Sequence, residues 1–204
     1  MRLSDLIGPA TPAGAALFLM WQGFHVLAVP KRESEEGNGA VRLFGVGGKR
    51  ADCQESFLDC AWREGKEEIG DVIAQIDSAA QTYLLQGHGT LKAIELSDQL
   101  PNPQLIWAKY CHSPHGSMAA SNQAYYLVAF NAQLAAQPKP LNEIAALIYL
   151  KDKHLAQIHH QPETTLRDLL AMGARVDCQP GSELPLETRF IPHGTVHFLL
   201  RQQE

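Results

Sequence analysis

One stretch, residues 47–71, GGKRADCQESFLDCAWREGKEEIGD, constrains this chain more than any other. It opens with a glycine pair, runs through a short polar loop, and then carries apolar residues at helical spacing, which predicts a helix. Gly70 is placed to end that helix. One side of the helix is expected to be apolar and to dock against the rest of the protein. Its members are Leu58, Ala61, Trp62, Gly65 and Ile69.

Three carboxylates lie late in the same helix, at Glu64, Glu67 and Glu68. At roughly 100° per residue, these spacings put all three on one side, opposite the apolar stripe. Like charges at such spacings cost a few tenths of a kcal/mol per pair. A divalent cation turns this repulsion into attraction, since Mg²⁺ takes oxygen ligands. The alternative is a solvated acidic face on a surface helix.

The residues around the carboxylates fit a site for a charged ligand. Arg63 has Asp59 four residues before it and Glu67 four residues after it, so it can hold a carboxylate in one orientation. Glu55 sits near the helix start, where negative charge suits the helix dipole. The glycine pair, Gly47 and Gly48, allows the backbone to approach a ligand closely.

Cations precede the helix in two places. Lys49 and Arg50 stand at the mouth of the loop, where they could meet polyphosphate oxygens or could be plain surface charges. The charged, glycine-rich segment 31–39 is interpreted as a solvated loop, with phosphate contact by Lys31 or Arg32 as the alternative.

In this register the stretch resembles the Nudix box, whose pattern is Gly, five residues, Glu, seven residues, Arg-Glu-apolar-any-Glu-Glu-any-Gly-apolar. The matching residues are Glu55, Arg63, Glu64, Glu67, Glu68 and Gly70. There are three departures from the pattern. The loop from Gly48 to Glu55 is one residue longer, so strict register puts Lys49 at the first glycine. Gly65 and Asp71 replace apolar residues.

The resemblance implies an α/β (α+β) fold, with a mixed β-sheet packed between helices. It implies a hydrolase that uses Mg²⁺ or Mn²⁺ to cleave the diphosphate linkage of a nucleoside diphosphate joined to another moiety. A non-catalytic nucleotide-binding or regulatory module is the alternative. An isomerase of isoprenoid diphosphates shares the fold class, but its Cys and Glu arrangement cannot be placed here.

Roles follow from the resemblance at the matching positions. The implied metal ligands are Glu64, Glu67, Glu68, the carbonyl of Gly48 (or Gly47) and, in support, Glu55. Glu64 or Glu68 could assist deprotonation of water, while a base from a distant loop is also known in the family. Arg63 would orient a glutamate. Glu143 is a candidate additional acid, although a plain loop carboxylate is an equal alternative.

Outside the box, strands are expected at 15–21, 24–29, 41–46, 91–96, 105–110, 124–130 and 142–150. Residues 1–14 are expected to be irregular, and 72–85 to be a helical turn or a strand. Helices are expected at 151–160 and 162–174, and a strand or helix at 196–200. Trp21, Phe44, Trp107 and Tyr125 could stack on a base, although packing in the core is the simpler interpretation. His112 and His115, in the polar loop 111–123, are interpreted as surface residues.

The length of 204 residues suits one domain with a proper core. The net charge of −5 argues against broad binding to nucleic acid, which needs a basic face. The four cysteines lack a CxxC pair and indicate no zinc site. No signal peptide or membrane span is visible, so a cytoplasmic protein is expected. Nudix proteins are often dimers, and the sequence leaves a homodimer open.

Overall fold

The computed structural model describes residues 1–31, 39–87, 89–110 and 124–202. Its helices are α1 (Leu3–Leu6), α2 (Phe57–Ile69), α3 (Asp152–His160), α4 (Leu166–Ala171) and α5 (Val196–Arg201). Its strands are β1 (Ala13–Trp21), β2 (Phe24–Pro30), β3 (Ala40–Leu43), β4 (Val46–Lys49), β5 (Ile73–Asp77), β6 (Thr82–Gln86), β7 (Leu91–Ile94), β8 (Leu105–Tyr110), β9 (Ala124–Leu134), β10 (Ile144–Leu150), β11 (Arg175–Cys178) and β12 (Arg189–Pro192).

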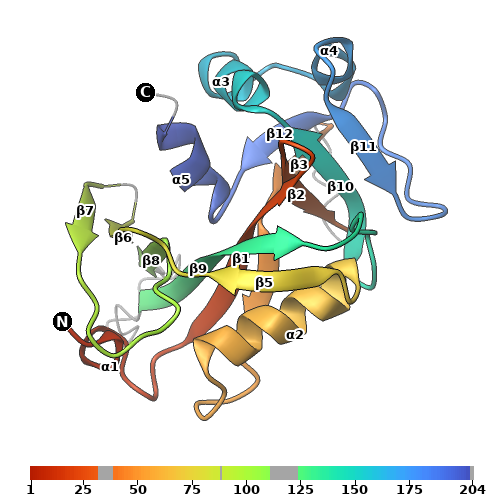
Figure 1. The fold of residues 1–204 in the computed structure, drawn as a ribbon. Coiled ribbons are helices and arrows are strands. Elements are labelled where there is room, and N and C mark those ends of the chain that lie inside the picture. Colours follow the sequence, from red (N-terminus) through yellow and green to blue (C-terminus); the bar gives the residue numbers. More distant parts are fainter. Residues whose placement is uncertain (32–38, 88, 111–123, 203–204) are drawn as a thin grey trace, which may run out of the picture.

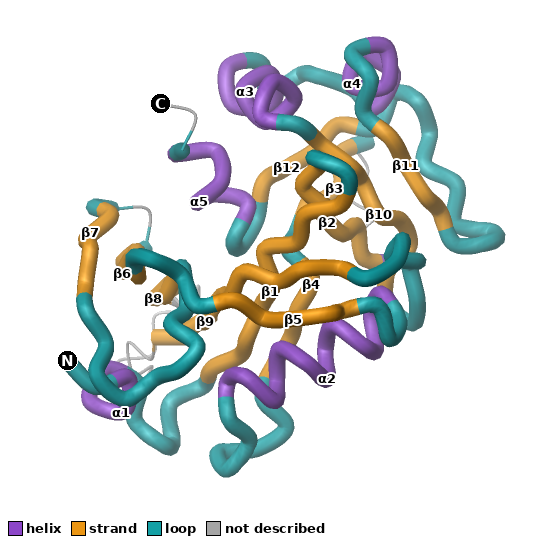
Figure 2. The backbone as a smooth tube through the Cα atoms, in the orientation of Figure 1, coloured by secondary structure: helices purple, strands orange, loops and turns teal. Residues whose placement is uncertain are grey.

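A mixed sheet of ten strands forms the centre of the fold. Its main path runs β11-β10-β2-β1-β9-β8-β6-β7, with β4 paired to β1 and β5 paired to β9, while β3 and β12 form a separate pair. Helix α2 lies on one side of this sheet and α3, α4 and α5 on the other (Figure 1). Figure 2 shows the same arrangement, with helices on both sides of the strands. The expected mixed sheet packed between helices is therefore confirmed.

Strand β1 separates two hydrophobic cores because its side chains alternate between the faces of the sheet. Ala15, Leu17 and Leu19 join the core under α2. Ala16 and Phe18 join the core under α3, α4 and α5, where the Phe18 ring lies 5.5 Å from that of Phe198 in α5. Both faces of the strand are covered, which explains its nearly continuous apolar sequence.

The expected strands 15–21, 24–29 and 105–110 are confirmed as β1, β2 and β8, and β1 pairs with β2 as an antiparallel hairpin. Of the open alternatives, the structure has the strands β5 and β6 after α2 and the helix α5 near the end. The ends of other strands shift, since β7 ends at Ile94 and β9 runs on to Leu134, and three segments differ more strongly from expectation. Segment 1–14 contains α1, because the Asp98 carboxylate accepts a hydrogen bond of 2.7 Å from the Leu3 N–H. The expected strand 41–46 splits into β3 and β4. The expected helix 162–174 shrinks to α4, which Thr165 caps at its start.

No helix in the described part of the chain is long and apolar enough to cross a membrane.

Candidate active site

Helix α2 buries most of its expected apolar side, and the buried side extends further, to Phe57 and Cys60. Ser56 caps its start by accepting a hydrogen bond from the Asp59 N–H, and Gly70 ends it with φ +87°, as expected. The buried residues are Phe57, Cys60, Ala61, Gly65 and Ile69. At 100° per residue, Glu64 and Glu68 fall in the middle of this buried side.

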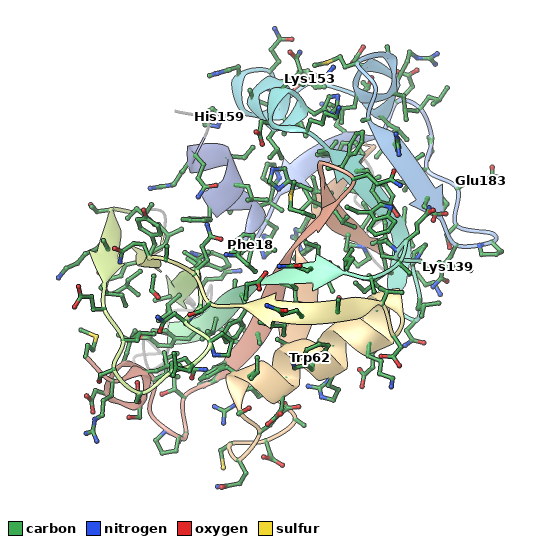
Figure 3. The ribbon with its side chains drawn as sticks, in the orientation of Figure 1. Phe18, Trp62, Lys139, Lys153, His159 and Glu183 are labelled. Carbon is green, nitrogen blue, oxygen red and sulfur yellow. The ribbon has the colours of Figure 1, made fainter. Side chains whose placement is uncertain are left out.

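Two expectations about α2 were therefore wrong. Trp62 does not dock, because it lies at the margin of the buried side and is 37% exposed (Figure 3). The three glutamates do not all lie opposite the apolar side: the side chain of Glu64 is 14% exposed, whereas that of Glu67 is 51% exposed. Glu64 and Glu68 instead reach toward β4.

The unusual glycine of the box, Gly65, has a packing reason. A Cβ at this position would lie 2.4 Å from Ile73 Cδ1 in β5 and 2.9 Å from Leu17 Cδ1 in β1. Distances under 3 Å require the neighbours to shift. Gly65 thus allows the helix to lie close to the sheet, which brings its carboxylates to the backbone of β4.

Arg63 organises the carboxylates from the outer side of the helix. Its Nε and Nη2 donate to the two oxygens of Glu55 at 2.8 and 3.1 Å, a bidentate pair. Its Nη1 donates to Glu64 Oε1 at 2.8 Å and more weakly to Glu67 Oε2 at 3.5 Å. The hydrogen bonds from Arg63 lower the pKa of Glu55 and keep it ionised. The expected partner Asp59 is instead bound by the Ser56 hydroxyl at 2.6 Å.

Glu68 has the most strongly shifted pKa among the described acids of the site. Its Oε2 accepts a hydrogen bond of 2.8 Å from the Gly47 N–H of β4. Burial raises the pKa of Glu68 to about 8, against the lowering effect of that hydrogen bond, and the charges of Glu64, Glu143 and Glu67 raise it further. Negative charge therefore accumulates at this point with one backbone donor to offset it, which is the environment a cation would stabilise.

The carboxyl group of Glu64 lies directly against Gly48. A Cβ on Gly48 would meet the Glu64 carboxyl atoms at 2.4 Å, so a glycine is needed for this approach. The Gly48 carbonyl oxygen lies 3.9 Å from the Cys60 thiol, and the Lys49 carbonyl accepts from Arg63 at 2.9 Å. The Lys49 carbonyl, which strict register with the box pattern would place at the first glycine, is therefore occupied by Arg63.

The donor set fits a hard divalent cation, because carboxylate oxygens from Glu64 and Glu68 flank a glycine backbone with no side chain in between. Within the described ranges, however, no three or more His, Cys, Asp or Glu side chains converge where they could hold a metal ion. Arg63 accounts for this, since it draws Glu55, Glu64 and Glu67 toward itself.

Glu143 lies near the site because the segment before β10 is hydrogen-bonded to the last turn of α2. The Leu141 N–H donates to the Glu68 carbonyl at 2.8 Å, and the Asn142 side chain donates to the Glu67 carbonyl at 2.6 Å. Asn142 adopts φ +47°, a conformation that asparagine tolerates. Glu143 itself is exposed, and its charge acts on Glu68.

The two candidate substrate-binding cations differ in their surroundings. The Arg50 guanidinium donates to the backbone carbonyls of Glu55 and Cys53 and lies 4.7 Å from the centre of the Phe57 ring, so it holds its own loop together. Lys49 borders two cavities. One, of about 440 Å³, lies against residues 9–13 and the box loop, and the other, of about 410 Å³, lies beside β8 and β9.

Three of the four aromatic candidates border the second cavity: Phe44, Trp107 and Tyr125. Trp21 borders a separate cavity beside β11. Strand β9 is half-buried over residues 124–127, where a fully buried strand was expected, because Tyr125 and Leu127 face this cavity. Arg32, His112 and His115 lie outside the described residues.

No pattern in the sequence marked the residues that close the second cavity from the C-terminal side. They are His193, Gly194 and Thr195, which precede α5, together with Lys109 on β8. A lone His or Thr at the end of a loop has no pattern that distinguishes it from a surface residue. Their role depends on a contact with Phe44, about 150 positions earlier in the chain.

No protein-family model matches the sequence, and a comparison with curated proteins gives no match. Among solved structures, a Nudix hydrolase from Nitrosomonas europaea aligns at 14% identity with a TM-score of 0.44, over 79% of this chain and 84% of that one. A Nudix-family hydrolase from Clostridium perfringens aligns at 14% identity and a TM-score of 0.44, over 70% and 83%.

A Nudix hydrolase family member from Chromobacterium violaceum aligns at 15% identity with a TM-score of 0.38, over 69% of this chain. That alignment spans 63% of the Chromobacterium protein, which is less than two thirds of its length. These structures carry the family name that the box resembles. At such identities we base the function on the residues of the site.

Proposed function

We propose that this chain is a Nudix-type hydrolase that cleaves the diphosphate linkage of a nucleoside diphosphate derivative with the help of Mg²⁺ or Mn²⁺. The observation that carries the proposal is the placement of two carboxylates, Glu64 and Glu68, against the glycines of β4. The same glycines border a cavity of about 410 Å³, large enough for part of a small-molecule substrate.

The proposal assigns cation binding to the glutamates and phosphate binding to Lys49. Glu64 and Glu68 would hold the cation, with Glu67, Glu55 and the Gly48 carbonyl as the further ligands that the resemblance implies. Such a cation, when bound, neutralises diphosphate charge and makes water more acidic. Lys49, at the border of both cavities, would pair with phosphate oxygens.

Glu68 is one of the candidates for proton transfer in this proposal. Glu68, whose pKa is raised to about 8, can exchange a proton near neutral pH. A bound cation would favour its ionised form and lower that pKa. Glu64 and a base from another loop, including Glu143, stay as alternatives for the general base. Arg63 would act as a positioning residue, because it holds Glu64 and Glu55 at 2.8 Å.

A panel of nucleoside diphosphate derivatives, assayed for phosphate release after phosphatase treatment with Mg²⁺ or Mn²⁺, tests the proposal. We expect turnover of at least one compound that requires the cation and is lost in Glu68→Gln. The matched control is Glu163→Gln, which removes a carboxylate with 81% side-chain exposure and should keep the wild-type rate. Equal rates in wild type and Glu68→Gln would refute the assignment.

A non-catalytic binding module is the second candidate, and one observation favours it. Arg63 occupies Glu64, and the described carboxylates do not converge on a common point. In that case calorimetry would detect nucleotide binding with no release from any compound of the panel. The homodimer and the cytoplasmic location stay predictions from the sequence.

A further inference from the structure

The cavity beside β8 and β9 has walls that suit a flat ring. The His193 ring lies 4.7 Å from Phe44 and 6.2 Å from Trp107, measured between ring centres. The Trp107 indole N–H donates to the Gly87 carbonyl at 2.9 Å, which fixes its orientation. Three aromatic walls in a cavity of about 410 Å³ favour a planar heterocycle, because rings bind rings by stacking and edge contacts.

Thr195 borders this cavity, and its buried hydroxyl has no partner among the described residues. Thr195 is 1% exposed, and its Oγ1 makes no hydrogen bond with any described residue. Thr195 is also the N-cap of α5, yet its side chain does not cap the helix. Gly45 leaves space for this hydroxyl, since a Cβ there would lie 2.3 Å from Oγ1. A buried hydroxyl that is left unpaired is costly, so it indicates a ligand atom as its partner.

The cavity and the acidic site share the backbone of β4. Gly47, Gly48 and Lys49 border it, and the Gly47 N–H is the group that binds Glu68. A ring in the cavity would therefore place an attached phosphate chain near Lys49 and the two glutamates. Lys109, whose Nζ lies 6.0 Å from the centre of the Trp107 ring, adds a second cation at the wall.

We propose that this cavity binds a nucleobase-like heterocycle of the substrate, and that residues 193–195 determine which heterocycle is accepted. These residues lie outside the part of the chain that resembles the Nudix family. The inference rests on the proposed function, and it names the substrate group and the residues that select it. Thr195 would hydrogen-bond to the polar edge of the ring, and the aromatic residues that border the cavity, Phe44, Trp107 and His193, would contact the ring.

The test is calorimetric titration with AMP, GMP, CMP and UMP in the absence of divalent cations, with ribose 5-phosphate as the ringless probe. We expect at least one nucleotide to bind and ribose 5-phosphate to give no detectable heat. Thr195→Val should weaken the preferred nucleotide about tenfold while keeping or raising the melting temperature, because no protein hydrogen bond is lost.

Thr82→Val is the matched control, since the buried Thr82 hydroxyl donates to the Pro103 carbonyl at 2.7 Å. It should lower the melting temperature and leave nucleotide binding unchanged. His193→Leu should also weaken the nucleotide, with the exposed His160→Leu as its control. Equal affinities in wild type, Thr195→Val and His193→Leu would overturn the proposal, and so would ribose 5-phosphate binding as tightly as the best nucleotide.

These outcomes separate the inference from the proposed function. Nucleotide binding that depends on Thr195, in a protein whose panel shows no Glu68-dependent release, supports the ring site and refutes the hydrolase. Release that depends on Glu68, with the same order of preference among bases in wild type and Thr195→Val, supports the hydrolase and refutes the ring site.

Discussion

Glu68→Gln should stabilise the metal-free protein, by an amount that grows with pH. The pKa of Glu68 rises from 4.5 to about 8 on folding, first through burial and then through the charges of Glu64, Glu143 and Glu67. Between these two values the folded state binds more protons than the unfolded state, so the free energy of unfolding falls as pH rises. Below pH 4.5 this penalty is absent, and above pH 8 it is complete.

The magnitude follows from the two pKa values. A difference of about 3.5 between them corresponds to on the order of 5 kcal/mol at high pH, at about 1.4 kcal/mol per unit. About 3 kcal/mol of this develops between pH 5.5 and pH 9. Glutamine keeps an oxygen that can accept the Gly47 hydrogen bond and carries no charge, so the variant escapes the penalty.

Urea unfolding at pH 5.5, 7 and 9, with EDTA present, measures this effect. The difference in unfolding free energy between Glu68→Gln and wild type should increase steadily across the series, whereas Glu163→Gln should show no comparable increase. Saturating Mg²⁺ at pH 9 should stabilise wild type and not Glu68→Gln, since a ligand stabilises the state that binds it. A difference that is the same at pH 5.5 and pH 9 would show that Glu68 is not held in a repulsive, buried environment.

Two further predictions concern the scaffold. His154 Nδ1 accepts a hydrogen bond from the Lys151 N–H at 2.8 Å, and burial lowers the pKa of His154 below 6.5. The free energy of unfolding should therefore fall as pH drops below about 6.5. His154→Asn should remove this pH dependence in urea titrations, and an unchanged dependence of the unfolding free energy on pH would contradict the prediction. Gly65→Ala should lower the free energy of unfolding in urea by about 1 to 3 kcal/mol, because the new Cβ would lie 2.4 Å from Ile73 Cδ1. This loss should outweigh the better helix propensity of alanine. A variant more stable than wild type would refute the close packing.

Local signals in the sequence predicted much of the fold. Gly70 ends α2 as expected, and the Gln22-Gly23 turn, with φ of +50° and +76°, joins β1 to β2. These features act over a few residues, so the sequence pattern contains them. The mixed sheet between helices followed from the resemblance at the box and from the alternation of strands and helices.

The orientation of α2 could not be read from the same pattern. The glutamates were expected on the side opposite the apolar stripe, yet Glu68 is held against β4 by the Gly47 N–H. That contact depends on Gly65, which permits close packing on Leu17 and Ile73. The apolar stripe correctly included the buried Ala61, Gly65 and Ile69. It left out Phe57 and Cys60, and it placed Trp62 at the interface although Trp62 is 37% exposed.

The second cavity depends on contacts between distant parts of the chain. Phe44, Trp107 and His193 come from the β3–β4 connection, from β8 and from the loop before α5. No period or spacing in the sequence links these positions. The aromatic residues could be named as candidates, whereas His193 and Thr195 became visible once the C-terminal segment was placed beside the sheet.

Binding of Mn²⁺ followed by electron paramagnetic resonance, with a non-hydrolysable methylene analogue of a nucleoside diphosphate present, tests the central claim most directly. Wild-type protein should hold Mn²⁺ in the complex, and the Glu64→Gln/Glu68→Gln double variant should leave it free in solution, while Glu163→Gln should match wild type. Equal Mn²⁺ binding by wild type and the double variant, or none by either, would contradict the account.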